Sequence, residues 1–202
     1  MKVDTLVIGA GAGGLGSAVW LEHYKKDYLV VDSAESLPMN MHNGVHYLHS
    51  IPELPFEADI KRITLTDGIL CNGNVEHRAG LNEALEYSEK VREIQHPSSI
   101  MEVGKKDYAF LPSTNTLNSL MREMHDNCNP EKFFFGYKLV SVNTVDKVAH
   151  FKGNGDINMS VEYYDVISTV PLNCIRTYFP ELELEEKELK CNPIYVTNYN
   201  IE

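Results

Sequence analysis

The sequence of 202 residues lacks several features that define other classes of protein. Its four cysteines are widely spaced and form no Cys-x-x-Cys pair, so that neither a zinc knuckle nor a dithiol redox motif is present, and buried free thiols are expected. The longest apolar runs, such as LVIGA, are far too short to cross a bilayer. The N-terminus brings in an acid at Asp4 and does not resemble a signal peptide. We therefore expect a cytoplasmic protein without a membrane span.

Positive charge is also scarce. Eighteen Lys and Arg residues stand against twenty-nine Asp and Glu residues, which gives a net charge of −11. Such a surface repels a phosphate backbone unless a local basic patch outweighs it, and the sequence contains no such patch. No serine, cysteine or pair of carboxylates has a spacing typical of nucleophilic or hydrolytic catalysis. Nucleic-acid binding and hydrolysis are therefore not expected, whereas a small-molecule substrate is.

The first thirty-two residues have the order of a strand, a glycine-rich turn, a helix and a second strand. A short apolar strand is predicted over residues 3–8, and a helix with apolar side chains at helical spacing follows the glycines. A second buried strand is predicted over residues 28–31, and Asp32 follows it directly. This order is typical of a dinucleotide-binding unit.

The glycines of this turn fit the pattern Gly-x-Gly-x-x-Gly, and each has its own physical role. Gly9 permits the tight turn, Gly11 lets backbone approach a pyrophosphate, and Gly14 lets the helix pack closely on the strand. The N-terminus of the helix then presents free N–H groups and a positive dipole end to the phosphates. Asp32, eighteen residues after Gly14, is near the position of an acid that binds a ribose diol. Because a carboxylate there disfavours a 2′-phosphate, FAD or NAD is expected rather than NADP.

A different pattern occupies residues 57–112, which we expect to be an insertion that carries substrate specificity. Residues 60–71 have the pattern of two strands around Asp67-Gly68, a dipeptide favoured in tight hairpins. Residues 80–94 place apolar side chains between charged ones, which predicts a helix with one polar face. The sequence thus predicts a small α+β insertion in a larger domain.

The second half of the chain returns to the larger domain. Four apolar side chains recur at helical spacing after a capping run at 112–115 and predict core packing: Leu117, Leu120, Met121 and Met124. Short strands are predicted between 133 and 164, as an antiparallel meander, and one more over 165–171, DVISTVP. We predict an α/β protein with a Rossmann-like FAD/NAD(P)-binding fold, in which residues 1–56 and 113–202 form the dinucleotide-binding domain.

These pieces together resemble the FAD-binding part of the flavoprotein family that includes amine oxidases, protoporphyrinogen oxidase, phytoene desaturase and UDP-galactopyranose mutase. The resemblance rests on GAGAGG near the start, the strand that ends in an acid, and DVISTVP, which matches the family's Thr/Ala-x-Pro ending. It implies FAD as cofactor, with NAD as the alternative, and adenine held by the backbone of Val140. The candidate cofactor-binding residues are Gly9, Gly11, Ala12, Gly13, Gly14, Asp32, Ser33, Val140, Thr169 and Pro171.

A histidine-rich stretch, HNGVHYLHS at 42–50, resembles the Gly-x-His-x-x-His-(Ser/Thr) segment of UDP-galactopyranose mutases. The resemblance places His46 against the flavin ring as the candidate catalytic residue, where an imidazole could hydrogen-bond to the flavin or relay a proton. A metal site is not expected, because in an extended segment His42 and His46 share a face whereas His49 points away, and zinc normally takes three or four ligands. Plain packing of these histidines remains an alternative.

Two departures from the family leave the function open. The family's arginine after the second strand is absent, and the resemblance covers about half of a complete enzyme. The leading interpretation is an FAD-binding oxidoreductase that transfers hydride from a small polar, amine-like substrate to flavin. The alternatives are a mutase-like flavoprotein that acts on a nucleotide sugar, and a non-catalytic dinucleotide-binding subunit. Either a homo-oligomer or a partner chain could complete the flavin pocket.

Overall fold

The fold was analysed in a computed structural model that describes residues 1–37, 48, 50–64, 68–71, 74–77, 108–114, 116–171 and 174–180. The chain divides into two compact units, which are described separately. The first unit consists of Met1–His42, Glu53–Ala58 and Asn118–Cys191. The second unit consists of Asn43–Pro52, Asp59–Leu117 and Asn192–Glu202.

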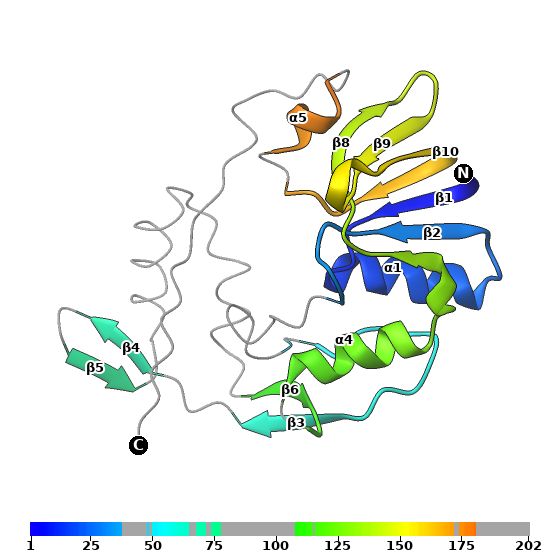
Figure 1. The fold of residues 1–202 in the computed structure, drawn as a ribbon. Helices are drawn as coiled ribbons and strands as arrows, with labels where there is room; N and C mark the ends of the chain where they lie inside the picture. Colours follow the sequence, from blue (N-terminus) through cyan, green and yellow to red (C-terminus); the bar gives the residue numbers. More distant parts are fainter. Residues whose placement is uncertain are drawn as a thin grey trace. The chain divides into compact units, whose positions relative to one another are not determined.

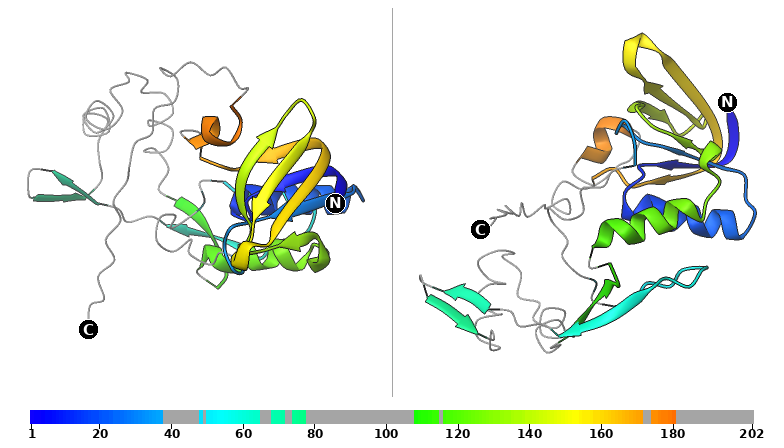
Figure 2. Two further views of the ribbon diagram at one scale, coloured as in Figure 1. Left: turned by 45° about the horizontal axis from the view of Figure 1, so that its top comes forward. Right: turned by 60° about the horizontal axis from the view of Figure 1, so that its bottom comes forward.

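The first unit is built on a six-stranded sheet with the strand order β7-β2-β1-β10-β9-β8 (Figure 1). The pairs β7–β2, β2–β1 and β1–β10 are parallel, whereas β10–β9 and β9–β8 are antiparallel. The strands of this sheet are β1 (Lys2–Ile8), β2 (Tyr28–Val31), β7 (Phe133–Phe134), β8 (Lys138–Asn143), β9 (Val148–Lys152) and β10 (Asn158–Ser168). The antiparallel meander β8–β9–β10 is seen from two further directions in Figure 2.

Helix α1 (Ala12–His23) connects β1 to β2 and packs on both strands and on β10. The other helices in the described part of the first unit are α4 (Leu117–Asp126, whose first residue is grouped with the second unit), α5 (Ile175–Tyr178) and the 3-10 turns η2 (Pro130–Lys132) and η3 (Asn154–Asp156). The four apolar residues predicted to form the buried face of α4 are all buried, which confirms that prediction. Within the described part of the chain, no helix is long and apolar enough to cross a membrane.

The core of the first unit lies in the middle of the sheet. All four residues of β2 are buried, as expected for a parallel strand covered on both faces. The meander instead alternates buried and exposed residues, with Phe151 and Val161 pointing to the core. The predicted α/β class, a Rossmann-like fold with parallel strands and an antiparallel meander, is confirmed.

Two strand predictions need correction. The segments 159–164 and 165–171 do not form two strands, because β10 runs without interruption from Asn158 to Ser168 and pairs with β9 first and with β1 later. The hairpin predicted around Asp67-Gly68 is also wrong. The strand before it, β3 (Ile60–Thr64), pairs with β6 (Tyr108–Pro112), and the strand after it, β4 (Gly68–Cys71), pairs with β5 (Asn74–His77). The turn preference of Asp67-Gly68 did not decide the pairing, because β3 pairs with β6, which is distant in the sequence.

The second unit contains these two antiparallel pairs. Leu48 adds a single bridge to Phe110 of β6, and the Arg62 guanidinium lies 3.8 Å from the centre of the Tyr108 ring. Residues 59–112 of the expected insertion fall in this unit, but its role as a substrate domain stays a prediction. The helix predicted over 80–94 lies outside the described residues.

Candidate functional site

The described part of the first unit contains a pocket of about 410 Å³ at the carboxyl ends of β1 and β2. Strand β1 lies between β2 and β10. The chain continues from β1 to β2 on one side, and β10 later pairs with β1 on the other side. Such a switch in strand order opens a crevice where ligands bind in open α/β sheets. The pocket is lined by Ile8, Gly9, Gly11, Val31, Asp32, Ser33, Tyr137, Lys138, Leu139, Phe151, Thr169, Val170, Pro171, Cys174 and Tyr178.

The glycine turn after β1 forms the floor of the pocket. Gly9 has a φ of +102°, and its N–H donates to the carbonyl of Val31 at 2.8 Å. A Cβ on Gly14 would lie 1.8 Å from the carbonyl oxygen of Gly9, so helix α1 presses directly on the turn. Both positions therefore require glycine for local reasons, before any ligand is considered.

Gly11 differs from these two glycines because a Cβ built on it would meet no atom within 4 Å in the described part of the chain. It is the N-cap of α1, without a side-chain cap and with no acidic residue in the first turn. The first intrahelical bond runs from Leu15 N–H to Gly11 O, so the earlier N–H groups have no acceptor within the helix. Open space in front of these donors, together with the positive end of the helix dipole, suits an anion such as a diphosphate.

Asp32, at the end of β2, ties two loops of the pocket together. Its Oδ2 accepts from Ala10 N–H at 2.6 Å, and its Oδ1 accepts from Ala34 N–H at 2.7 Å. The half-buried carboxylate also lines the pocket. Since two carboxylate oxygens offer about four acceptor sites, ribose hydroxyls can still donate to it.

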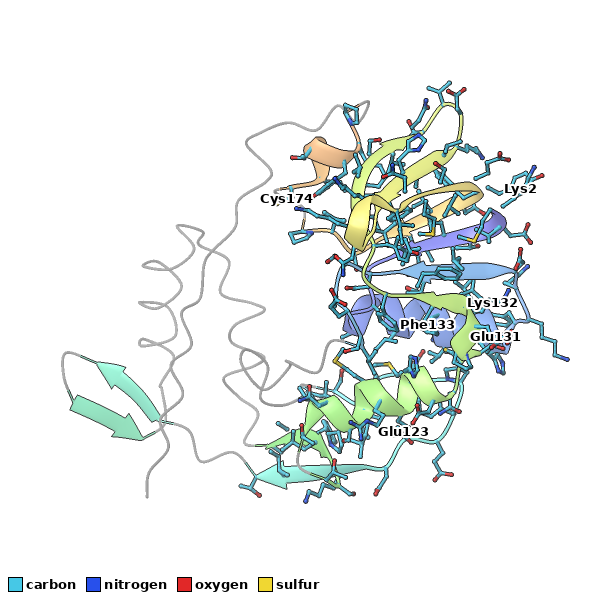
Figure 3. The ribbon with its side chains drawn as sticks, in the orientation of Figure 1. Lys2, Glu123, Glu131, Lys132, Phe133 and Cys174 are labelled. Atoms are coloured by element: carbon cyan, nitrogen blue, oxygen red, sulfur yellow. The ribbon has the colours of Figure 1, made fainter. Side chains whose placement is uncertain are left out.

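The remaining walls come from the meander and from the segment after β10. Leu139 and Phe151 are buried, face each other across β8 and β9, and provide apolar surface. Among the described residues that line the pocket, Lys138 is the one basic residue and Asp32 the one acid. Cys174, labelled beside α5 in Figure 3, completes the rim as an exposed free thiol. A wall that is mostly apolar with a few polar groups is typical of nucleotide pockets.

The predicted site residues fall into three groups. Six of them line the pocket: Gly9, Gly11, Asp32, Ser33, Thr169 and Pro171. Four of them do not line it: Ala12 and Gly13 are exposed on the first turn of α1, Gly14 is buried under the turn, and Val140 is half-exposed at an irregularity in β8. The predicted catalytic residue, His46, lies outside the described residues, as do His42 and His49.

The lining residues that sequence reasoning missed are Ile8, Val31, Tyr137, Lys138, Leu139, Phe151, Val170, Cys174 and Tyr178. Val140 itself does not line the pocket, whereas Lys138 and Leu139 of the same strand do, and its role in binding adenine stays a prediction. Within the described part of the chain, no group of three or more His, Cys, Asp or Glu side chains is arranged to hold a metal ion.

A second polar cluster lies at the start of β2, where the Tyr28 hydroxyl donates to Glu22 Oε2 at 2.6 Å. Burial, and then this bond to a carboxylate, raise the pKa of Tyr28 far above its usual value. Burial also raises the pKa of the Cys128 thiol to about 11. Both groups are therefore protonated at neutral pH.

The fold and the pocket define a Rossmann-like architecture with a pocket at the switch in strand order. No family model and no curated protein matches the sequence. Among solved structures, reduced UDP-galactopyranose mutase is similar with a TM-score of 0.59 and 12% identity, over 88% of this chain and 57% of that chain. A flavoprotein/dehydrogenase from Cytophaga hutchinsonii is similar with a TM-score of 0.51 and 10% identity, over 88% and 42%.

Putrescine oxidase with bound putrescine is similar with a TM-score of 0.51 and 11% identity, over 89% of this chain and 60% of that chain. At these identities the likeness shows the fold alone. This chain spans less than two thirds of the length of each of these proteins.

Proposed function

We propose that this chain binds FAD through the pocket at the glycine turn and is the FAD-binding part of an oxidoreductase-type flavoprotein. The observation that carries the proposal is the open, uncapped N-terminus of α1 at Gly11, facing the same pocket as the Asp32 carboxylate. Backbone N–H groups would hold the diphosphate, and Asp32 would accept hydrogen bonds from the adenosine ribose. Ser33 and Pro171 would border the nucleotide.

The size and lining of the pocket support the adenosine diphosphate part of such a cofactor. Its volume of about 410 Å³ is within the usual range of small-molecule sites. Leu139 and Phe151 offer apolar surface for a planar base, and Lys138 adds a positive charge to the lining of the pocket. NAD shares this half of the molecule, so the choice of FAD rests on the likeness to flavoproteins.

When bound, FAD supplies hydride transfer, and the protein supplies binding and orientation. In this proposal the substrate is small, polar and amine-like, which the likeness to putrescine oxidase supports. The resemblance of the histidine-rich stretch makes His46 the candidate that hydrogen-bonds near the reacting centre or moves a proton there. A second copy or a partner chain would complete the flavin half of the pocket.

A second candidate is a mutase-like flavoprotein that acts on a nucleotide sugar without net oxidation. The likeness to reduced UDP-galactopyranose mutase and the matching histidine stretch favour it. A third candidate is a non-catalytic dinucleotide-binding subunit. The Rossmann-like fold and the pocket at the glycine turn are also compatible with such a subunit.

The absorbance spectrum and solution mass of the purified protein test the proposal first, followed by titration with FAD, ADP and NAD. We expect a flavin band, or FAD affinity well above NAD affinity; a colourless protein that binds none of the three would refute it. Bleaching of the band by amines without oxygen indicates the oxidase, whereas turnover of a UDP-sugar only after reduction indicates the mutase. His46→Ala should slow flavin reduction without releasing FAD, and an unchanged rate would remove His46 from the mechanism.

A further inference from the structure

Thr169, the first residue after β10, makes two hydrogen bonds to one acceptor at the edge of the pocket. Its backbone N–H and its hydroxyl Oγ1 both donate to the carbonyl of Ile8, each at 2.9 Å. Ile8 is the last residue of β1 and pairs with Ser168 in parallel register. The hydroxyl therefore fastens the last carbonyl of β1, immediately before the glycine turn begins.

The same side chain also lies against the turn on two sides. A Cβ built on Gly9 would lie 2.1 Å from Thr169 Oγ1, and one built on Gly13 would lie 3.5 Å from Thr169 Cγ2. The hydroxyl thus occupies the space that any side chain at Gly9 would need. The Thr169 methyl group would be in van der Waals contact with a side chain at Gly13, on the first turn of α1.

We propose that Thr169 is a positioning residue: its hydroxyl sets the shape of the glycine turn, and thereby the aim of the N–H groups at Gly11 and beyond. The inference rests on the proposed dinucleotide binding. A ligand held by backbone N–H groups depends on their direction, because a hydrogen bond weakens steeply as its angle closes. Thr169 would then affect affinity through the turn, in addition to lining the pocket.

Three substitutions separate the hydroxyl from the bulk of the side chain. Thr169→Ser keeps the hydroxyl and removes the methyl group, Thr169→Val keeps the shape and removes the hydroxyl, and Thr169→Ala removes both. Each variant is titrated with ADP and with FAD by calorimetry, and its thermal midpoint is measured in parallel. The amide NMR shift of Gly11 on adding ADP reports the aim of the turn directly.

We expect Thr169→Ser to bind within about threefold of wild type, and Thr169→Val and Thr169→Ala to bind about tenfold more weakly. The Gly11 shift should shrink in the last two variants even where the thermal midpoint is kept. Wild-type affinity in Thr169→Val would overturn the inference, as would equal losses in the serine and valine variants. If wild type binds neither ADP nor FAD, the proposed function itself fails.

A double-mutant cycle with Gly9→Ala tests the shape of the turn without any ligand. It therefore distinguishes failure of the inference about Thr169 from failure of the proposed dinucleotide binding. Gly9→Ala introduces strain at positive φ in every background, but the clash with Oγ1 exists only when Thr169 is present. Gly9→Ala raises the equilibrium constant of unfolding by some factor in each background. We expect this factor to be at least about fivefold smaller in Thr169→Ala than in wild type. Additive effects would show that the hydroxyl does not shape the turn.

Discussion

Polar groups near the two ends of β2 differ in whether they have partners within the protein. At its carboxyl end, the uncapped N-terminus of α1 at Gly11 faces a pocket, and a Cβ built on Gly11 would meet no atom of the described residues within 4 Å. At its amino end, Tyr28 and the backbone N–H of Asn129 both donate to Glu22, and Lys132 pairs with Asp27 at 2.9 Å. Figure 3 labels Lys132 at this second end and Cys174 at the first.

This difference separates stability from binding. Groups at the amino end of β2 are satisfied within the protein, so changing them alters folding. Donors at the carboxyl end have no intrahelical acceptor, and changing their surroundings alters what the protein can bind. Substitutions at the two ends should therefore move different observables. The carboxyl end itself can be divided further, because Gly14 packs on the turn whereas Gly11 faces open space.

The largest effect is expected for Gly14→Ala. The new Cβ would lie 1.8 Å from the carbonyl oxygen of Gly9, which is backbone and cannot rotate away. Helix α1 must shift from the turn, and we expect a loss of about 3 kcal/mol or more in the free energy of unfolding. Urea denaturation measures this loss. A variant as stable as wild type would show that the helix does not pack on the turn as closely as described.

The next effect falls mainly on binding and is expected for Gly11→Ala. Its φ of −73° suits alanine, and the new methyl group would meet no atom of the described residues within 4 Å. The free energy of unfolding should fall by no more than about 1 kcal/mol, because alanine is a poorer helix N-cap than glycine. Affinity for ADP and FAD should fall about tenfold or more, because the methyl group stands where the diphosphate would approach.

Calorimetric titration checks this second expectation, with Gly16→Ala as the matched control on the same helix. Unchanged affinity in Gly11→Ala would place the anion elsewhere. Loss of affinity in both variants would indicate a general effect on α1 rather than a contact at its N-terminus.

The comparison of the two ends also explains what the sequence could predict. The glycine turn was predictable because its residues are close in the chain and each glycine has a local structural reason. Gly9 has a positive φ, Gly14 packs against backbone, and Gly11 leaves open space before the helix. The walls were not, since Phe151 and Tyr178 reach the pocket only through strand order and a later helix. Non-local pairing likewise decided that β3 joins β6 instead of β4.

A third prediction concerns alkaline pH at the amino end of β2. Tyr28 and Cys128 have pKa values raised by burial, so the folded state holds protons that the unfolded state releases. Stability should therefore be full below about pH 9 and fall as the pH rises from there toward 11, at up to about 1.4 kcal/mol per pH unit for each group.

Tyr28→Phe removes one of these two groups. We expect a loss of about 1 kcal/mol at neutral pH, from the lost bond to Glu22, and a shallower decline above pH 10. Denaturation at pH 7, 9 and 10.5 measures both. An identical decline in wild type and variant would mean that Tyr28 does not contribute to the alkaline loss.

The smallest effect is expected for Gly16→Ala, and it has the opposite sign. Gly16 lies inside α1, two residues beyond Gly14, and a Cβ there meets nothing within 4 Å. Alanine should therefore raise the free energy of unfolding by about 0.5–1 kcal/mol, since glycine in a helix interior loses more conformational freedom on folding. Affinity for ADP should not change, because Gly16 is not among the residues that line the pocket. The three substitutions would then differ in kind: Gly14→Ala causes a large loss of stability, Gly11→Ala a loss of binding and Gly16→Ala a small gain of stability. A loss of stability in Gly16→Ala would contradict the environment described for this face of α1.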